Sequence, residues 1–215
     1  MNTLINALPY LAQGALQTLW IAVATIVLST FLGTCLGCLA VLKPNTFGRL
    51  VQLYVYIIRG IPILILLFVG YFSLQAFGFF LNDYLAILII LAGYGCAIVT
   101  EVVRGAVLSV PKTQWLAAQG VGFTNWQAMY FVILPQAARF SIPPMFNTYI
   151  HLIKATSFIS VVGIWELTLA ARQVTERTGE PFLILLSVMM FYYALCYPLA
   201  LLSRRAEAQL AKSGG

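Results

Sequence analysis

The chain has 215 residues, of which 61% are hydrophobic and only 8% charged, and its mean hydropathy is +0.93. This composition excludes an ordinary soluble globular domain. A membrane-spanning helix needs about 20 predominantly apolar residues, so the chain has room for roughly five or six spans. The net charge of +6 does not indicate a nucleic-acid-binding protein, because the basic residues are scattered among apolar ones and form no stripe.

Five apolar runs predict five transmembrane helices and therefore an all-α integral membrane protein. In chain order they cover about residues 11–42, 50–80, 84–110, 135–154 and 182–202. The fourth run becomes ambiguous after Lys154. The sequence shows no internal repeat and no soluble segment of domain size, so residues 1–215 are expected to form a single transmembrane domain.

The distribution of Lys and Arg beside these runs predicts their orientation. Two basic residues, Arg172 and Arg177, fall on one side of the membrane. The other side collects Lys43, Arg49, Lys112, Arg139, Arg204, Arg205 and Lys212. Because cytoplasmic loops carry the excess of Lys and Arg, we expect an outside N-terminus and a cytoplasmic C-terminus. Residues 112–135 then face the cytoplasm.

Cysteines and glycines in the first run indicate close packing of helices. Cys35 and Cys38 form a CxxC pair, a spacing that elsewhere serves redox chemistry or metal binding. Here the pair lies inside an apolar helix without a second pair, which favours packing, and no metal site is expected. Gly33 and Gly37 lie four residues apart and would let a neighbouring helix approach closely.

A polar, glycine-containing stretch, "QWLAAQGVGFTNWQAMYFVILPQ", separates the third and fourth runs. Thr113 can cap a first short helix, which the glycines of residues 120–122 would end. "TNWQ", starting at Thr124, has the spacing of a capping box and predicts a second short helix that Pro135 interrupts.

Two interpretations of this stretch remain open on physical grounds. It can be a compact helix–turn–helix that contacts a partner. It can also be a hairpin that lies on the lipid surface, with Trp115 and Trp126 at the level of the headgroups.

"LAAQGVG", followed by nine residues and "VILP", resembles the cytoplasmic motif of ABC importer permeases, EAA-x3-G-x9-I-x-LP. Val132 replaces the Ile of that motif, and Leu116 stands where the family usually has Glu. In the family the motif forms a coupling helix that docks into a cleft on the ATPase subunit. The resemblance therefore implies a coupling role for Leu116, Ala117, Ala118, Gly122, Leu134 and Pro135.

The resemblance covers nearly the whole chain and is specific to the polar amino-acid uptake family, the permeases for histidine, arginine and glutamine. It rests on "QGALQTLWIA", "IIRGIPILILLF", "TEVVRGAVLSVPKTQW" and "LPQAARFSIPPMFNTYIHLIKATSFISVVGIWEL". Ala155 departs from the family, where Asp is common. The resemblance implies a type I ABC importer permease fold, import of polar or basic amino acids such as arginine, histidine or glutamine, and the bacterial cytoplasmic (inner) membrane.

The same resemblance implies the partners. The chain has no GxxxxGK[ST] phosphate loop, so it is not expected to be an enzyme. ATP hydrolysis would take place in a separate ATPase subunit, which would bind ATP and Mg, and this chain would carry no cofactor. A second permease subunit, identical or paralogous, and an extracytoplasmic solute-binding protein complete the expected assembly.

Charged residues within the apolar runs are candidates for function, because a lone charge in a membrane is costly. Glu101 and Arg104 are three residues apart on one helix, which favours a structural ion pair. Arg59 precedes Gly60 and Pro62, where it either marks a loosened span or anchors the helix by reaching the interface.

Lys154 lies well across the bilayer from Pro135 at about 1.5 Å per residue, and hydroxyls follow it at Thr156 and Ser157. This group can bind the carboxylate of an amino acid or join helix ends, and both interpretations stay open. Glu166 can face the outer loop or attract a cationic solute.

Two other classes of protein are disfavoured. A self-sufficient secondary transporter, the main alternative, should show internal repeats and ion-coupling carboxylates at mid-membrane, and neither is visible. An integral membrane enzyme needs a convergent catalytic set, whereas His151 is the single histidine and no acidic pair accompanies it.

Overall fold

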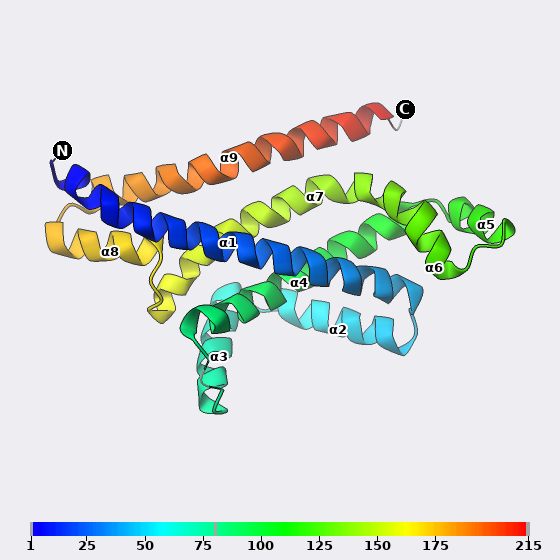
Figure 1. Ribbon diagram of the computed structural model, residues 1–215, viewed down its shortest axis with the longest axis horizontal. Coiled ribbons are helices and arrows are strands. Elements are labelled where there is room, and N and C mark those ends of the chain that lie inside the picture. The colour runs from blue at the N-terminus through cyan, green and yellow to red at the C-terminus, as the bar shows by residue number, and fades with distance from the viewer. Residues whose placement is uncertain (1, 80, 214–215) are drawn as a thin grey trace. The chain divides into compact units, whose positions relative to one another are not determined.

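The computed structural model describes residues 2–79 and 81–213, and every regular element in these ranges is helical (Figure 1). In chain order the elements are α1 (Asn2–Leu42), α2 (Thr46–Gly60), α3 (Ile63–Ala76), α4 (Asp83–Ser109), α5 (Lys112–Gly120), α6 (Asn125–Ala128), the π-helical turn η1 (Met129–Ile133), α7 (Leu134–Ala155), the 3-10 helix η2 (Thr156–Val162), α8 (Leu167–Thr178) and α9 (Pro181–Ser213).

Three of the described helices, α1, α4 and α9, have the length and apolar composition to cross a membrane. Two further pairs of helices, each interrupted by a short break, bring the number of spans to as many as five. The predicted all-α membrane fold is confirmed. Helix α9 runs well past the predicted end near residue 202, because the polar sequence "RRAEAQLAK" consists largely of good helix formers.

The second apolar run is one of these interrupted pairs, with its break at Gly60 and Pro62, where the sequence indicates a loosened span. Helix α2 ends at Gly60, and α3 begins after Pro62. Ile61 has φ −104° and ψ 132°, an extended conformation. A proline disfavours helical geometry in the residue before it, which accounts for the break at this position.

The ambiguous end of the fourth run contains two further elements. After α7 the chain tightens into η2, which ends at Gly163 with φ +82°. The Gly163 N–H donates to the Ser160 carbonyl at 3.1 Å, and the Ile164 N–H donates to the Ile159 carbonyl at 3.4 Å. These bonds satisfy carbonyls at the end of η2, and they require a residue with left-handed backbone conformation at position 163. Helix α8 follows at Leu167.

The described residues fall into two compact units. The first comprises residues up to Val27 together with Pro62–Ala92 and Tyr149–Leu199. In its core α1 packs on α8 and α9 through small and branched side chains, including Ala15, Ala170 and Ile184. Figure 1 shows α8 beside the N-terminal part of α1. A Cβ at Gly14 would lie 3.0 Å from the Ala170 Cβ, so this approach requires a glycine.

The second unit comprises Leu28–Ile61, Gly93–Thr148 and the residues from Ala200 onward. Its core joins α4 to η1 through buried side chains such as Val103, Val107 and Ile133. A Cβ at Gly33 would lie 2.6 Å from the Val99 Cβ, and one at Gly37 would lie 2.9 Å from the Val103 Cβ. The predicted close approach of a helix at these two glycines is therefore confirmed, with α4 as the neighbour.

Candidate functional site

The candidate site is the helical hairpin of α5 and α6, which belongs to the second unit and joins α4 to α7 (Figure 1). Helix α5 begins at Lys112 with Pro111 as its N-cap and no side-chain cap. The Pro111 carbonyl accepts the Gln114 N–H at 3.0 Å. The prediction that Thr113 caps this helix is wrong, because Thr113 already lies in the first turn. The fixed φ of proline supplies the helix start instead.

The turn between the two helices depends on Gly122, whose φ is +89°. The Gly122 N–H donates to the Gln119 carbonyl at 2.9 Å, and the Phe123 N–H donates to the Ala118 carbonyl at 3.1 Å. This pair of bonds is the Schellman motif, in which a left-handed glycine closes a helix. No heavy atom lies within 4 Å of where a Cβ on Gly122 would stand. Within the chain, glycine is thus required by backbone conformation and not by space.

Helix α6 starts with the predicted capping box, which the structure confirms. The Gln127 N–H donates to Thr124 Oγ1 at 3.3 Å, and the Thr124 N–H donates to Gln127 Oε1 at 2.9 Å. Across the turn, Gln119 Nε2 donates to Asn125 Oδ1 at 3.0 Å. The C-terminal end of α5 and the N-terminal end of α6 are therefore both capped within the turn that joins them.

The prediction that Pro135 interrupts the second helix is wrong. The chain continues from α6 through η1 into α7, where Pro135 is the second residue. Proline has no N–H for the bond to the carbonyl four residues earlier, and its ring would clash with that carbonyl in an α-helix. The wider π-helical turn lies immediately before this proline. The Gln136 side-chain amide donates to the Val132 carbonyl at 2.8 Å.

Gln114 of α5 and Gln136 of α7 make a contact that sequence reasoning missed. Gln136 Nε2 donates to Gln114 Oε1 at 3.3 Å and so joins the start of α5 to the start of α7. These residues are the first and the last of the stretch singled out in the sequence. Two amides at the ends of a predicted hairpin are the signal that could have identified them.

The hairpin has a buried and an exposed side. Ala128, Met129 and Ile133 point into the second unit and are almost fully buried. The opposite side carries exposed large apolar side chains, with Leu116 66% exposed and Val121 74% exposed. Trp126, Tyr130 and Phe131 continue this exposed set. An exposed apolar surface of this kind is typical of a contact with protein or lipid.

The six predicted coupling residues divide between the two sides. Leu116, Ala117, Gly122 and Pro135 are exposed. Ala118 is only 4% exposed, so its methyl group packs inside the permease. Leu134 is half-buried and packs against the core of the second unit. Ala118 and Leu134 therefore shape the hairpin from within.

Of the other charged candidates, Glu101 and Arg104 form the predicted ion pair within α4. Arg104 Nη2 donates to Glu101 Oε1 at 2.7 Å, and Arg104 Nε donates to Glu101 Oε2 at 2.9 Å. The two-pronged geometry neutralises both charges within one helix. No group of three or more His, Cys, Asp or Glu side chains in the described ranges could hold a metal ion.

The residues predicted for the solute path lie in the first unit. Lys154 is exposed in the last turn of α7. The Thr156 hydroxyl is buried and donates to the Ile153 carbonyl at 2.7 Å. The Ser157 hydroxyl donates to the Lys154 carbonyl at 2.8 Å. Both hydroxyl protons are thus donated to backbone carbonyls. Of these three side chains, Lys154 is then the one with an exposed polar group.

Glu166 does not face the outer loop, because its side chain is fully buried in the first unit. It caps α8, with the Leu169 N–H donating to Oε1 at 2.9 Å. Thr18 Oγ1 lies 3.2 Å from Oε2, and the Tyr192 hydroxyl lies 3.4 Å from it. The Leu167 N–H donates to Thr18 Oγ1 at 3.1 Å. The carboxylate therefore joins α1, α8 and α9.

Apolar helices of spanning length, interrupted by one hairpin with an exposed apolar side, are typical of a multi-span integral membrane protein. The comparisons with known proteins agree. The chain belongs to the family of binding-protein-dependent transport system inner membrane components, whose family model matches residues 29–208. It is thus an integral inner-membrane component of such a transport system.

Similar proteins of known or assigned role support this membership. The chain is 32% identical over 205 residues to the probable glutamine ABC transporter permease protein GlnP of Bacillus subtilis (strain 168), with 94% of each chain covered. It is 31% identical to the L-cystine transport system permease protein TcyB of the same organism, covering 94% of this chain and 87% of that one. The crystal structure of an amino acid ABC transporter with histidines superposes with a TM-score of 0.85 at 25% identity, covering 95% of this chain and 96% of that chain.

Proposed function

We propose that this chain is the permease subunit of an ATP-driven importer that moves a polar or basic amino acid into the cytoplasm of a bacterium. One observation carries the proposal: the residues that match the importer motif form a self-capped hairpin with an exposed apolar side. The names of the similar permeases share the amino-acid class, one for glutamine and one for L-cystine. Since GlnP and the superposed structure are named as ABC transporter proteins, a self-sufficient secondary transporter is disfavoured.

The exposed side of the hairpin is the surface that we assign to a separate ATPase subunit, which binds ATP and Mg and hydrolyses the nucleotide. Leu116 stands where the importer motif has Glu, so this position would contribute apolar contact instead of a polar bond. Burying a leucine side chain contributes about 1.5–3 kcal/mol. Ala117 and Gly122 would let the partner approach the backbone closely.

The remaining partners follow from the proposed role. A second permease, identical or paralogous, would complete the solute path, and an extracytoplasmic binding protein would deliver the solute. Within the path, Lys154 is the group that we assign to the carboxylate of the amino acid, with Ser157 and Thr156 shaping the chain beside it. A contact between Glu166 and a cationic solute would require the cap of α8 to open.

Gly122→Asp tests the coupling assignment. Aspartate tolerates left-handed backbone better than most residues, so the variant mainly adds a charge and a Cβ to the exposed turn. Gly179→Asp is the matched control, because Gly179 also has positive φ, +69°, and open space around it but closes α8 in the first unit. We expect less ATPase subunit to co-purify with tagged Gly122→Asp permease, and uptake to fall with it.

The comparison is made at matched permease levels, and the Gly179→Asp variant should retain the ATPase subunit like the unmodified chain. Normal retention and normal uptake in Gly122→Asp would remove Gly122 from the coupling contact. Attachment of the hairpin to lipid alone predicts that result, since an added aspartate would then leave the ATPase subunit bound.

A further inference from the structure

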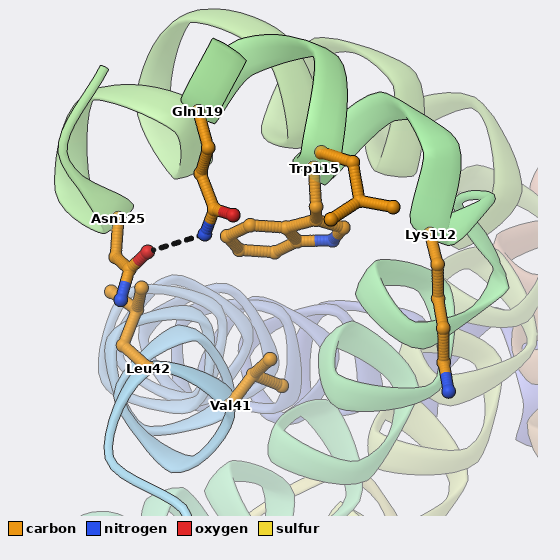
Figure 2. A pocket seen from close by; sticks show the side chains of 7 residues that line it. Val41, Leu42, Lys112, Trp115, Gln119 and Asn125 are labelled. Atoms are coloured by element: carbon orange, nitrogen blue, oxygen red, sulfur yellow. Dashed lines mark hydrogen bonds between the residues drawn. The ribbon is translucent and has the colours of Figure 1, made fainter. Parts of the chain in front are cut away.

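A cavity of about 360 Å³ lies in the second unit between the end of α1 and the hairpin (Figure 2). Its lining residues come from three segments and include both apolar and polar side chains: Val41, Leu42, Lys112, Trp115, Leu116, Gln119 and Asn125. None of them is acidic. The cavity adjoins the exposed side that we assign to the ATPase subunit, because Leu116 belongs to both.

The polar groups of the cavity include donors without a negative partner. Lys112 is exposed and makes no salt bridge within residues 2–79 and 81–213. The Asn125 Oδ1 accepts from Gln119 Nε2 at 3.0 Å, which leaves the Asn125 amide hydrogens available (Figure 2). The indole of Trp115 lies between Gln119 and Lys112 in the same view. An anion is the complement of this set.

The apolar side of the cavity is equally defined. Val41 and Leu42 belong to the last turn of α1 and lie across the cavity from the Trp115 indole (Figure 2). A small soluble anion would leave these side chains in contact with water. A molecule with an anionic group and a hydrocarbon part would cover both sides.

The position of the cavity along the spans indicates which molecule this is. Helix α1 ends at Leu42, and α4 ends at Ser109, three residues before Lys112. Both helices have the length and composition of membrane spans. Since both helices end beside the cavity, we place it at the level of the phospholipid headgroups. Tryptophan and lysine are enriched at this level.

We propose that this cavity binds an anionic phospholipid, with its phosphate at Lys112 and the upper part of its acyl chains against Val41 and Leu42. Phosphatidylglycerol has the required negative charge, whereas phosphatidylcholine has the same phosphate with a compensating cation. One basic residue near the membrane surface favours the anionic lipid about fivefold. The site does not depend on transport, so it can be tested on the permease alone.

The test uses quenching of Trp115 fluorescence by lipids with brominated acyl chains. The permease is placed in phosphatidylcholine vesicles that contain a minor fraction of brominated phosphatidylglycerol or, in parallel, of brominated phosphatidylcholine. The difference between the chain and Trp115→Phe isolates the signal of Trp115. We expect stronger quenching by phosphatidylglycerol, a preference that falls about fivefold in Lys112→Gln.

Arg204→Gln is the control, because Arg204 is an exposed basic residue of the same unit that does not line the cavity. It should keep the lipid preference. Equal quenching by the two lipids, or an unchanged preference in Lys112→Gln, would overturn the proposal. Relief of quenching by inorganic phosphate would instead identify a soluble phosphate as the occupant. Equal loss of the quenching by both lipids after addition of purified ATPase subunit would assign the cavity to that protein.

Discussion

Substitution of Gly33 by alanine tests the helix packing most directly. A Cβ at this position would lie 2.6 Å from the Val99 Cβ, 2.7 Å from the Val99 Cγ1 and 2.9 Å from the Cys96 carbonyl oxygen. Contacts this short force α1 and α4 apart, and overpacking of this kind costs roughly 1–3 kcal/mol. Alanine also raises helix propensity by about 0.8–1.0 kcal/mol, which offsets part of that cost.

Gly105→Ala separates the two effects. Gly105 lies inside α4, and no heavy atom is within 4 Å of its Cβ position, so alanine there should only gain helix propensity. The difference between the two variants is then the overpacking alone, about 1–3 kcal/mol. The free energy of unfolding of the purified permease, titrated with SDS in mixed micelles, measures it. A Gly33→Ala chain as stable as Gly105→Ala would refute the close approach of α1 and α4.

Three further predictions concern the first unit and the orientation of the chain. Glu166→Ala should destabilise the permease by about 1–3 kcal/mol, because the Leu169 N–H and the Tyr192 hydroxyl lose their acceptor. Glu166→Gln should destabilise it less, because the amide oxygen still caps α8. The order is read from SDS titrations, and equal stabilities would contradict it. Lys154→Met should abolish uptake while leaving the unfolding free energy near that of the unmodified chain, whereas unimpaired uptake would leave Lys154 a structural role. A reporter fused after Gly215 should be active in the cytoplasm and one inserted at Asp83 outside, and the reverse pattern would invert the proposed topology.

Features that depend on neighbouring residues in the sequence could be predicted. The capping box of Thr124 and Gln127 and the ion pair of Glu101 and Arg104 each join residues three apart, so the helix period alone brings them together. The glycines of α1 were predicted to allow a close helix contact, although the sequence could not show that α4 is the neighbour.

Features that depend on distant residues could not be predicted. Glu166 is buried because Thr18, 148 residues away, and Tyr192, 26 residues away, surround its carboxylate. No local pattern shows such an arrangement, so the sequence left open whether Glu166 faces the outer loop or attracts a cationic solute. The orientation of Ala118 has the same origin, since a small side chain fits either side of a helix and only the packing of the second unit places it inside.

Proline shows that one residue type can act in opposite ways. Pro62 follows an extended Ile61 and separates two helices, while Pro143 and Pro144 lie inside α7 without ending it. The sequence indicates that a proline removes one hydrogen bond. The helix breaks where nothing compensates for the lost hydrogen bond. Before Pro135 the π-helical turn compensates for it, and the helix continues.

The π-helical turn between α6 and α7 also sets an angle. Successive residues of an α-helix are rotated by about 100°, and a π-helical turn accommodates one extra residue. Inserting one more residue between Gly122 and Val132 would exceed what the turn accommodates and would rotate the hairpin about the α7 axis by about 100°. Deleting one residue would instead convert the turn to regular α-helix and leave the hairpin nearly in register. The interval should therefore tolerate the loss of one residue better than the gain of one. Because no loop separates the hairpin from α7, a rotation of the hairpin would also rotate α7.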